Sequence, residues 1–494
     1  MALIIREPSY PTRSLQFLQQ HAISASQNGG TGHPGPMPSV EVPRAAVLLN
    51  IIIVGAGLGG LSAAIALSRR GHIVTVLEQA EALGEVGAGI QIPSNSTRLL
   101  LNWGLGEFLG RNVAEPEAMS FLRWQNGEKI GHTKLVPDFQ ENFGAPYYVV
   151  HRAHLHAALY KCALKLGVTV HVGCKVEAYS ADAGTVRLAN GVSYTGDLVV
   201  AADGINSIAR REILKENDIK PTATGFAVYR ATVDVEKIKA DPELAWILEK
   251  PSLNIWIGED RHVMTYTIAG GKSFNMVLSH VDRSNPATWR ADTAIEDMQR
   301  YFQGWDPRLV KIIRMIDQTI KWPLMNIPPL PRWVAVSNRL LVIGDAAHAM
   351  VPYMSQGAAM AVEDGAALGE VLSLINHRAQ LPLALAVFEQ VRMKRSYQMQ
   401  EASLLNGKLW HFSDGPEQKA RDKAMRPEVE GKHFLSSANQ WSDPVTQWWA
   451  YGYDAEIEVA KEWRSRHAAL DSVLGDCGNG LERLKVNGND ANES

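Results

Sequence analysis

Residues 51–60 read Ile-Ile-Ile-Val-Gly-Ala-Gly-Leu-Gly-Gly, an apolar run that passes directly into a glycine-rich turn. Four consecutive apolar residues are typical of a strand buried on both faces. In such a turn, Gly55 permits the tight bend, Gly57 lets a pyrophosphate approach the backbone, and Gly60 lets the next helix pack on the strand. The stretch predicts the strand, turn and helix of a dinucleotide-binding α/β unit.

The residues that follow extend this unit. Residues 61–70 predict the helix, and residues 72–78 predict a second strand. Glu78 lies 18 residues after Gly60, where an acidic residue binds ribose hydroxyls in such units. A glycine motif alone is a weak signal, but the strand, the helix and the acid at this spacing together predict a dinucleotide site.

A transmembrane helix is the competing interpretation of the same region. Residues 45–68 contain no charged residue, which a hydropathy window can take for a membrane span. Four glycines and Asn50 interrupt the run, and its β-branched residues crowd the first half. These features favour strand, turn and helix, so we expect no membrane span.

A second motif lies far along the chain. Residues 340–343 predict another buried strand, and Asp345 follows at its carboxyl end, where it can accept hydrogen bonds from a sugar or ribityl hydroxyl. Gly357 and Ala358 open an Ala-rich helix, so backbone N–H groups there can approach a planar ring closely. We predict that the two motifs hold one ligand.

Three residues between the motifs are further candidates for binding this ligand. Gly89 lies in a glycine-rich segment that can run beside a flavin or ribityl group, the alternative being an ordinary loop. Arg152, at the start of a predicted helix, can reach pyrophosphate or ribityl oxygens. Asp203 ends a predicted strand and can orient polar groups around a cofactor, although Asp-Gly is also a common turn signal.

Residues 151–156 contain three histidines, which raises the possibility of a metal site. On a helix His151 and His154 share a face but His156 does not, and no acid completes a ligand set. We therefore predict no metal.

The composition is ordinary for a globular enzyme, with 46% hydrophobic and 20% charged residues in 494. A net charge of −3 predicts neither a nucleic-acid partner nor strong membrane attraction. The three cysteines, Cys162, Cys174 and Cys477, show no CxxC spacing, which favours a reducing compartment and a cytoplasmic protein. Two arginines and one acid in the first 20 residues leave mitochondrial targeting as an alternative to an extension without function.

From residue 225 to residue 322 the pattern changes to longer alternating segments that predict an antiparallel sheet with hairpin turns. The predicted strands are residues 226–233, 252–257, 262–268 and 273–278. One face of this sheet is expected to close a cavity over the ligand. Farther on, residues 383–405 predict a long helix with Arg392 and Arg395 on or near a solvated face, and the Trp-rich residues 440–464 predict a helical layer over the core.

These motifs, in this order, resemble the single-component (group A) FAD-dependent aromatic hydroxylases, which include p-hydroxybenzoate and salicylate hydroxylases. The resemblance covers residues 49–405. Residues 85–93 and 449–454 are most similar to fungal salicylate-hydroxylase-like enzymes, including phenol-dearomatising monooxygenases. The family often has Gly-Gln-Gly where this chain has Ser355-Gln356-Gly357, a difference that we expect the flavin site to tolerate.

The resemblance implies an α/β fold, with a Rossmann-like FAD-binding domain of the p-hydroxybenzoate hydroxylase type, an interleaved antiparallel-sheet substrate domain and a helical C-terminal region. The expected segments are a disordered extension (1–48), a first FAD-binding segment (49–220), the substrate sheet (221–330), a second FAD-binding segment (331–410), the helical region (411–474) and a disordered tail (475–494). The FAD-binding residues would be Gly55, Gly57, Gly60, Glu78, Gly89, Arg152, Asp203, Asp345, Gly357 and Ala358.

The implied activity is an oxidoreductase that hydroxylates a phenol or aromatic acid with NAD(P)H and O₂ through a C4a-hydroperoxyflavin, in aromatic catabolism or fungal secondary metabolism. In the family NAD(P)H reduces FAD without a second nucleotide-binding domain, and the sequence contains no second GxGxxG. The alternative is a flavin reductase or oxidase on the same fold.

The catalytic candidates are Arg230 and Tyr266, because the dearomatising enzymes place an arginine and a tyrosine on comparable strands. A phenol with a pKa of about 10 is poorly ionised at neutral pH, so a cation and a hydrogen-bond donor at its oxygen would accelerate oxygen transfer. The alternative is that Arg230 is a charge at the sheet edge and Tyr266 a core residue with a satisfied hydroxyl. His262 and Tyr229 are further candidates, with Tyr229 on the face opposite Arg230.

Overall fold

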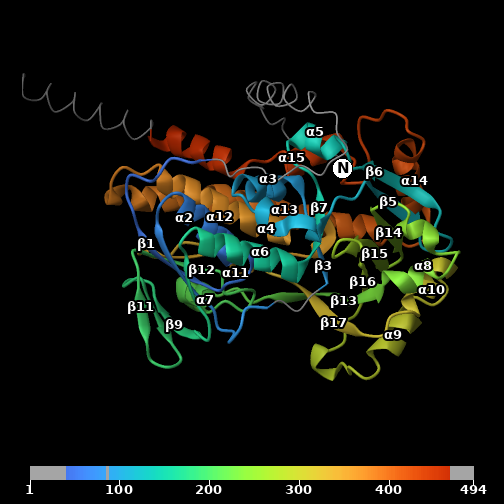
Figure 1. The fold of residues 1–494 in the computed structure, drawn as a ribbon, viewed down its shortest axis with the longest axis horizontal. Coiled ribbons are helices and arrows are strands. Elements are labelled where there is room, and N and C mark those ends of the chain that lie inside the picture. Colours follow the sequence, from blue (N-terminus) through green and yellow to red (C-terminus); the bar gives the residue numbers. More distant parts are fainter. Residues whose placement is uncertain (1–40, 85–87, 468–494) are drawn as a thin grey trace, which may run out of the picture.

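The computed structural model describes residues 41–84 and 88–467 (Figure 1). The predicted extension up to residue 40, residues 85–87 of the glycine-rich segment and the predicted tail with Cys477 lie outside the described residues.

A five-stranded parallel sheet brings the two sequence motifs together. Its strands, in spatial order, are β18 (Leu340–Val342), β12 (Leu198–Ala201), β1 (Asn50–Val54), β2 (Ile73–Leu77) and β8 (Thr169–His171). Every pairing in it is parallel. The carboxyl ends of β1, β12 and β18 therefore meet at one edge, where open α/β sheets bind ligands.

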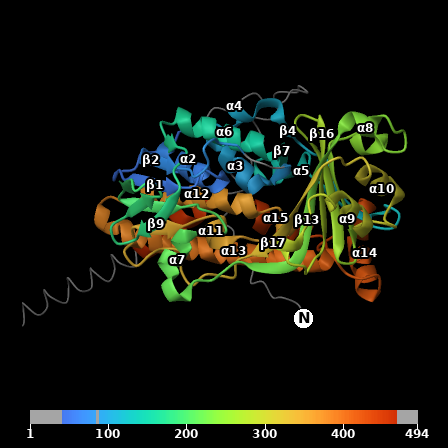
Figure 2. The same ribbon diagram turned by 90° about the horizontal axis from the view of Figure 1, so that it is seen from below.

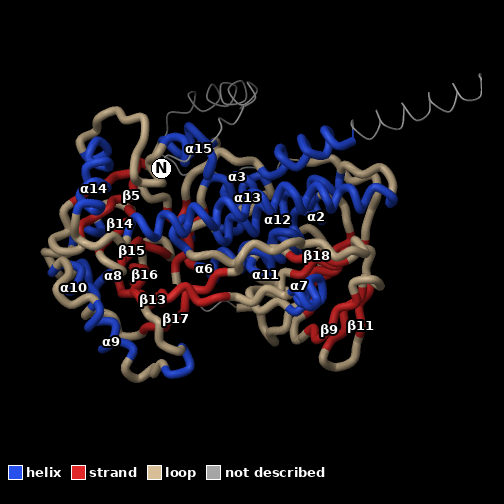
Figure 3. Tube along the Cα trace, turned by 180° about the vertical axis from the view of Figure 1, so that it is seen from behind, coloured by secondary structure: helices blue, strands red, loops and turns tan. Residues whose placement is uncertain are grey.

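Helices cover this sheet, and the longest of them lie side by side above it in Figures 1 and 3. They include α2 (Leu58–Arg69), α6 (Arg152–Lys165), α12 (Gly357–Ser373) and α13 (Leu381–Trp410). The short helices α7 (Ile208–Leu214) and α11 (Asp345–His348) begin just after β12 and β18. The apolar residues of the sheet and these helices form one continuous core.

A seven-stranded sheet forms the second half of the molecule. Its strands, in spatial order, are β17 (Thr319–Asn326), β13 (Thr222–Asp234), β16 (Ser273–Val281), β15 (Arg261–Ile268), β14 (Ser252–Gly258), β5 (Ala118–Arg123) and β6 (Lys129–Lys134). The predicted hairpins form antiparallel pairs. The sequence did not predict β5 and β6, which join from the earlier segment, nor the parallel pairing of β5 with β14.

The two faces of this sheet pack against different elements. The outer face is covered by α8 (Val235–Lys239), α9 (Ala294–Tyr301) and α10 (Pro307–Ile313), and the inner face packs against the helices of the parallel-sheet half (Figure 2). Alternation along β13 places Tyr229 in the outer core, as predicted, and its ring stacks on His280. Tyr266 belongs to the inner core.

Two three-stranded sheets complete the set of described strands. One contains β3 (Gly89–Ile92), β7 (Tyr148–His151) and β4 (Val113–Ala114), and the other β9 (Val176–Ser180), β10 (Thr185–Leu188) and β11 (Ser193–Thr195). The segment around Gly89 is therefore a strand, because its backbone pairs with β7. Short helices α3 (Ser94–Asn102), α4 (Gly106–Leu109) and α5 (Asp138–Phe143) connect these strands.

The C-terminal region is helical, as predicted. It contains α14 (Pro416–Val429), α15 (Pro444–Tyr451) and a helix over residues 455–467. Trp441 and Tyr451 are fully buried in the inner core, so this region packs onto the junction of the two halves. Among the helices of the described residues, none is long and apolar enough to cross a membrane.

Glu456 makes the stability of this region depend on pH. Burial, with smaller contributions from Asp454 and Glu370, raises the pKa of Glu456 from 4.5 to about 7. The folded chain holds this proton more tightly, so the stabilisation is complete below about pH 4.5 and is lost as the pH rises through 7. We expect Glu456→Gln to raise the Tm above about pH 7 and to leave it unchanged near pH 5. Calorimetry on this variant and on Glu462→Gln, from the same helix, tests this; a gain that does not depend on pH would contradict it.

Candidate active site

The glycines in the turn after β1 have two different roles. Gly55 and Gly60 are required by close backbone packing, whereas Gly57 faces open space. Gly55 adopts a φ of +103°, and a Cβ there would lie 2.4 Å from the carbonyl oxygen of Ala202. A Cβ on Gly60 would lie 1.9 Å from the carbonyl oxygen of Gly55. Among the described residues, and apart from its two chain neighbours, no atom lies within 4 Å of the corresponding position on Gly57, at the N-terminus of α2. A side chain at Gly57 would therefore enter the space where a phosphate can meet this helix end.

Glu78 lies beside this turn, at the carboxyl end of β2. Its Oε2 accepts a hydrogen bond from the backbone N–H of Ala56 (2.8 Å), and Oε1 accepts one from Ala80 (2.9 Å). These bonds fix the carboxylate, and each oxygen retains acceptor capacity for a hydroxyl group. This geometry fits the predicted contact with a ribose.

Asp203 fixes the start of α7 and keeps one oxygen unused. Its Oδ2 accepts bonds from the N–H groups of Ile208 (2.9 Å) and Ala209 (3.2 Å), and from the hydroxyl of Tyr179 (3.1 Å). Its Oδ1 is buried and has no hydrogen-bond partner among the described residues. A buried acceptor of this kind requires a donor, so Asp203 has both a capping function and an atom available to a ligand.

Three charged side chains interact where the two halves of the molecule meet. Arg152 begins α6, and Asp345, which is exposed, begins α11. Burial lowers the pKa of Arg152, the positive charge of Arg230 lowers it further, and Asp345 raises it. Arg152 is thus a largely buried cation near both Arg230 and Asp345, and its planar guanidinium has the geometry that binds phosphate oxygens.

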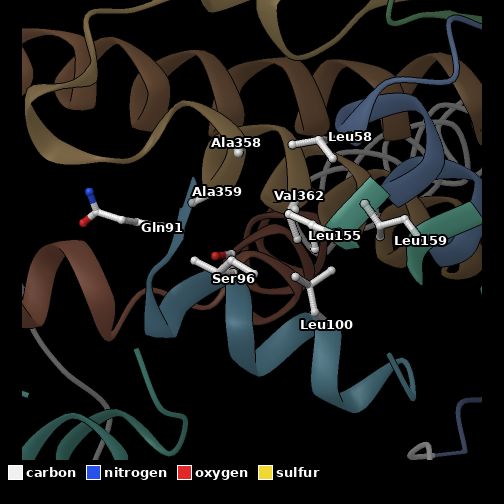
Figure 4. A pocket seen from close by; sticks show the side chains of 10 residues that line it. Leu58, Gln91, Ser96, Leu100, Leu155, Leu159, Ala358, Ala359 and Val362 are labelled. Carbon is white, nitrogen blue, oxygen red and sulfur yellow. The ribbon is translucent and has the colours of Figure 1, made fainter. Parts of the chain in front are cut away.

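The start of α12 leaves space around Gly357. Ser355, which stands where the family often has glycine, adopts the left-handed conformation with a φ of +53°. The nearest atom to a Cβ on Gly357 would be Cγ of Met350, at 3.9 Å. Ala358 borders a small apolar pocket between α2, α3, α6 and α12 (Figure 4). Its other lining residues are Leu58, Gln91, Ile92, Ser96, Leu100, Leu155, Leu159, Ala359 and Val362.

A buried network of charges and hydrogen bonds holds the two parts of the second motif together. Asp364 on α12 accepts a hydrogen bond from the N–H of Gly344 (3.0 Å), and His348 Nε2 lies 2.6 Å from its Oδ2. Glu363 accepts a bond from Asn95 Nδ2 (2.7 Å), which also donates to Gln356 Oε1 (2.9 Å). The network connects the turn after β18, the N-cap of α12 and helix α3.

The prediction that Arg392 and Arg395 lie on a solvated face is wrong. Their exposed fractions are 0% and 2%, because both face the carboxylates of α12. Arg392 donates from Nε to Asp364 (2.8 Å) and through another guanidinium nitrogen to Glu363 (2.7 Å), and Arg395 pairs with Glu363 at 3.3 Å. Burial alone would raise the pKa of Asp364, but His348 and Arg392 lower it to about 2.

The structure brings Tyr266 and Arg230 to the same face of the seven-stranded sheet. Tyr266 is 2% exposed and packs on Gly89, where a Cβ would lie 2.4 Å from the tyrosine ring and 2.8 Å from its hydroxyl. Burial raises the pKa of Tyr266, while the positive charge of Arg230 and the nearby side chain of Gln91 lower it. Tyr266 is therefore a neutral hydrogen-bond donor under the positive potential of Arg230, which is itself partly exposed.

The other sequence candidates have structural partners. His262 lies on the inner face, but its Nδ1 is 2.9 Å from Nε2 of His411, and burial lowers its pKa. His151 accepts a hydrogen bond from the N–H of Ala153 (3.2 Å), and His156 Nε2 lies 2.7 Å from the carbonyl of Ala56. Across residues 41–84 and 88–467, no three His, Cys, Asp or Glu side chains form a group that can hold a metal.

Three polar residues beside Tyr266 were not predicted from the sequence. Asn275, its cross-strand neighbour, accepts a hydrogen bond from the N–H of Gly89 (2.7 Å). Gln91 and Tyr147 are buried close by, and the hydroxyl of Tyr147 donates to Gln91 Oε1 (2.6 Å). Strand alternation could have identified Asn275, but Gln91 and Tyr147 belong to a different sheet segment and carried no sequence signal.

Comparison with known proteins gives consistent matches along most of the chain. A family model described as FAD binding domain matches residues 49–402. The chain is 38% identical over 414 residues to the FAD-dependent monooxygenase OpS4 of Beauveria bassiana (strain ARSEF 2860), which covers 83% of this chain and 96% of that protein. It is 31% identical over 392 residues to a 3-hydroxybenzoate 6-hydroxylase of Klebsiella oxytoca, which covers 79% and 95%.

A solved structure shares the fold. A salicylate hydroxylase in complex with its substrate superposes with a TM-score of 0.68 at 25% identity, and the match covers 84% of this chain and 98% of that one. The family match, from residue 49 to residue 402, contains both the turn after β1 and the start of α12, the two motifs predicted to hold one ligand.

Proposed function

The chain belongs to the FAD-dependent monooxygenases of the aromatic-hydroxylase type, and we propose that it hydroxylates a phenolic ring bound beside Tyr266 and Arg230. The predicted fold type and FAD cofactor are confirmed, and NAD(P)H is the typical co-substrate of this family. The relatives favour the monooxygenase activity over the alternative, a reductase or oxidase. The observation that carries the proposal is the shared inner face of Tyr266 and Arg230 next to Gly89.

The residues at the sheet edge fit FAD. The space at Gly57 suits the pyrophosphate at the N-terminus of α2, and the acceptors of Glu78 suit the ribose. The unpartnered Oδ1 of Asp203 and the carboxylate of Asp345 would accept from hydroxyl groups, and Arg152 would bind phosphate or ribityl oxygens. We further propose that Gly357 and Ala358 present the start of α12 to the flavin ring.

When bound, FAD would accept the electrons of NAD(P)H and activate O₂, so that one oxygen atom is transferred to an aromatic carbon. The protein has to orient the phenol, stabilise its ionised form and exclude water. Tyr266 Oη would donate its hydrogen to the phenolate oxygen, because the raised pKa keeps the tyrosine protonated. Arg230 would stabilise the negative charge on the same oxygen or on a neighbouring carbonyl. The surrounding inner core shields Tyr266 from water.

Replacement of either residue tests this proposal. We expect Tyr266→Phe and Arg230→Met each to lower kcat/KM for phenol hydroxylation by about 100-fold, because each removes one stabilising contact to the phenolate. Bound FAD should remain unchanged in its visible spectrum. NAD(P)H oxidation and product formation are measured together on a panel of phenols and benzoates.

The matched control is Tyr229→Phe, which removes a hydroxyl from the outer face of the same sheet and should leave hydroxylation unchanged. If Tyr266→Phe and Arg230→Met hydroxylate at the wild-type rate, the proposed roles are wrong. If both variants lose FAD, the two residues hold the cofactor instead of the substrate.

We propose small aromatic substrates and O₂ as the reaction partners, with no nucleic-acid partner, and a cytoplasmic location, which the free thiols of Cys162 and Cys174 favour. The segments 49–220 and 331–410 are proposed to bind FAD together, and 221–330 is proposed as the substrate segment, to which β5 and β6 contribute a hairpin.

A further inference from the structure

We propose that Asn275 binds a second oxygen of the substrate, next to the phenolate oxygen that Tyr266 holds. On this basis the chain selects phenols that carry an oxygen acceptor, such as a hydroxyl, carbonyl or carboxylate group, at the neighbouring position of the ring. This inference rests on the proposed function, in which the phenol lies beside Tyr266, and it adds the position of a second polar group on the substrate.

Asn275 lies on the inner face of the seven-stranded sheet, on the strand next to that of Tyr266. Its neighbours in sequence, Phe274 and Met276, belong to the outer core, so alternation along β16 turns Asn275 to the inner face. In the pairing of β16 with β15, Asn275 stands directly opposite Tyr266. Directly opposed side chains on one face of a sheet are close neighbours. Asn275 therefore shares a face with the tyrosine that is proposed to hold the phenolate.

The contact with Gly89 shows that the polar groups of these two residues lie close together. The position of a Cβ on Gly89 would lie 2.8 Å from the hydroxyl oxygen of Tyr266 and 2.9 Å from Cγ of Asn275. Because both atoms are this close to a single point, the tyrosine hydroxyl and the amide of Asn275 are side by side at Gly89. A phenol whose oxygen meets the hydroxyl reaches the amide most directly with a group on the neighbouring ring position, whereas a para group points to the opposite side of the ring.

Gly89 also determines which atom of the Asn275 amide is unused. The N–H of Gly89 donates to Asn275 Oδ1 (2.7 Å). A backbone N–H can only donate, so the atom that it meets must be the amide oxygen, and the amide nitrogen is left over. Asn275 is fully buried, and its Nδ2 has no hydrogen-bond partner among the described residues. A buried donor of this kind requires an acceptor, and an oxygen of the bound substrate would supply one.

Catechol and hydroquinone test this inference on the wild-type protein. The two isomers carry the same hydroxyl groups, at neighbouring ring positions in catechol and at opposite positions in hydroquinone. We expect the Kd of catechol to be lower by at least about 5-fold, because only catechol offers an acceptor to Nδ2 of Asn275 while Tyr266 holds its other oxygen. Binding is measured in the absence of O₂, from the change in the visible spectrum of the bound FAD. Equal affinities for the two isomers would overturn the inference.

Asn275→Leu tests whether this residue is responsible for the preference. Leucine has nearly the shape of asparagine but no donor, so the ratio of the two Kd values should fall to less than about twofold. Because the ratio is taken within one variant, a general loss of stability or of FAD affinity does not change it.

Ser279→Ala is the matched control and should keep the wild-type ratio. Ser279 is also buried on β16, and its Oγ also lacks a partner in the part of the chain that the structure describes, but it stands opposite His262 instead of Tyr266. A wild-type ratio in Asn275→Leu, or a lost preference in Ser279→Ala, would overturn the assignment to Asn275.

Failure of the proposed function would give a different result. If Tyr266→Phe hydroxylates at the wild-type rate, or if neither isomer binds to the FAD-loaded protein, the phenol site itself is wrong. If Tyr266→Phe is impaired but the wild type shows no preference for catechol, only the role of Asn275 is wrong.

Discussion

Arg392→Met is expected to lower the free energy of unfolding by about 3–5 kcal/mol. The substitution leaves two fully buried carboxylates without this guanidinium: Glu363 keeps Arg395, and Asp364 keeps His348. Breaking a buried ion pair from one side is costly because the other charge stays desolvated. Methionine fills most of the same volume, so the loss reports on charge more than on packing.

Urea denaturation of the FAD-bound protein measures this loss. Lys394→Met, two residues along the same helix and exposed, is the control and should change the free energy of unfolding by less than about 0.5 kcal/mol. The pH dependence gives a second check. The lowered pKa of Asp364, about 2, stabilises the wild type above about pH 4, and this stabilisation is lost as the pH falls toward 2. The deficit of Arg392→Met should therefore shrink at acidic pH, and a deficit that is constant with pH would contradict the charge argument.

The same network contains a feature that could not be predicted from the sequence, the burial of Arg392. The spacing of Gly55, Gly57, Gly60 and Glu78 predicts their geometry, because all four belong to one continuous strand–turn–helix–strand unit, in which Glu78 reaches back to the N–H of Ala56. Burial of Arg392 depends instead on Glu363, which lies on another helix. An arginine on a long helix is solvated by default, and only the packing of α12 on α13 reverses this.

The candidate active site likewise contains residues that the sequence indicated and residues that it did not. Arg230 and Tyr266 became candidates through the resemblance to the dearomatising enzymes and their place on predicted strands, and the structure places both on the inner face. Gln91 and Tyr147 were not identified, since their burial beside β15 requires β3 and the segment before β7 to pack on that strand. The pairing of β5 with β14 is likewise a long-range parallel contact that no local pattern records.

Gly57→Val is expected to lower the affinity for FAD by at least about 100-fold, which corresponds to about 3 kcal/mol of binding free energy. Beyond its chain neighbours, a Cβ at Gly57 meets no atom of residues 41–84 and 88–467 within 4 Å, and the backbone at Gly57, with φ of −70°, accommodates any residue. The apoprotein should therefore unfold at the wild-type urea concentration. A valine would instead occupy the space proposed for the pyrophosphate and block its approach to the N–H groups of α2.

Gly60→Ala is the matched control. It also adds a side chain to a glycine of the same turn, but this side chain would point into the protein backbone instead of into open space. A Cβ at Gly60 would lie 1.9 Å from a backbone oxygen that cannot move aside without opening the turn, so this variant should lose stability even without FAD. Fluorescence titration of each apoprotein with FAD, combined with urea denaturation, separates the two effects. Wild-type FAD affinity in Gly57→Val would place the pyrophosphate elsewhere. Equal destabilisation of both apoproteins would mean that the space at Gly57 is needed for folding and not for the cofactor.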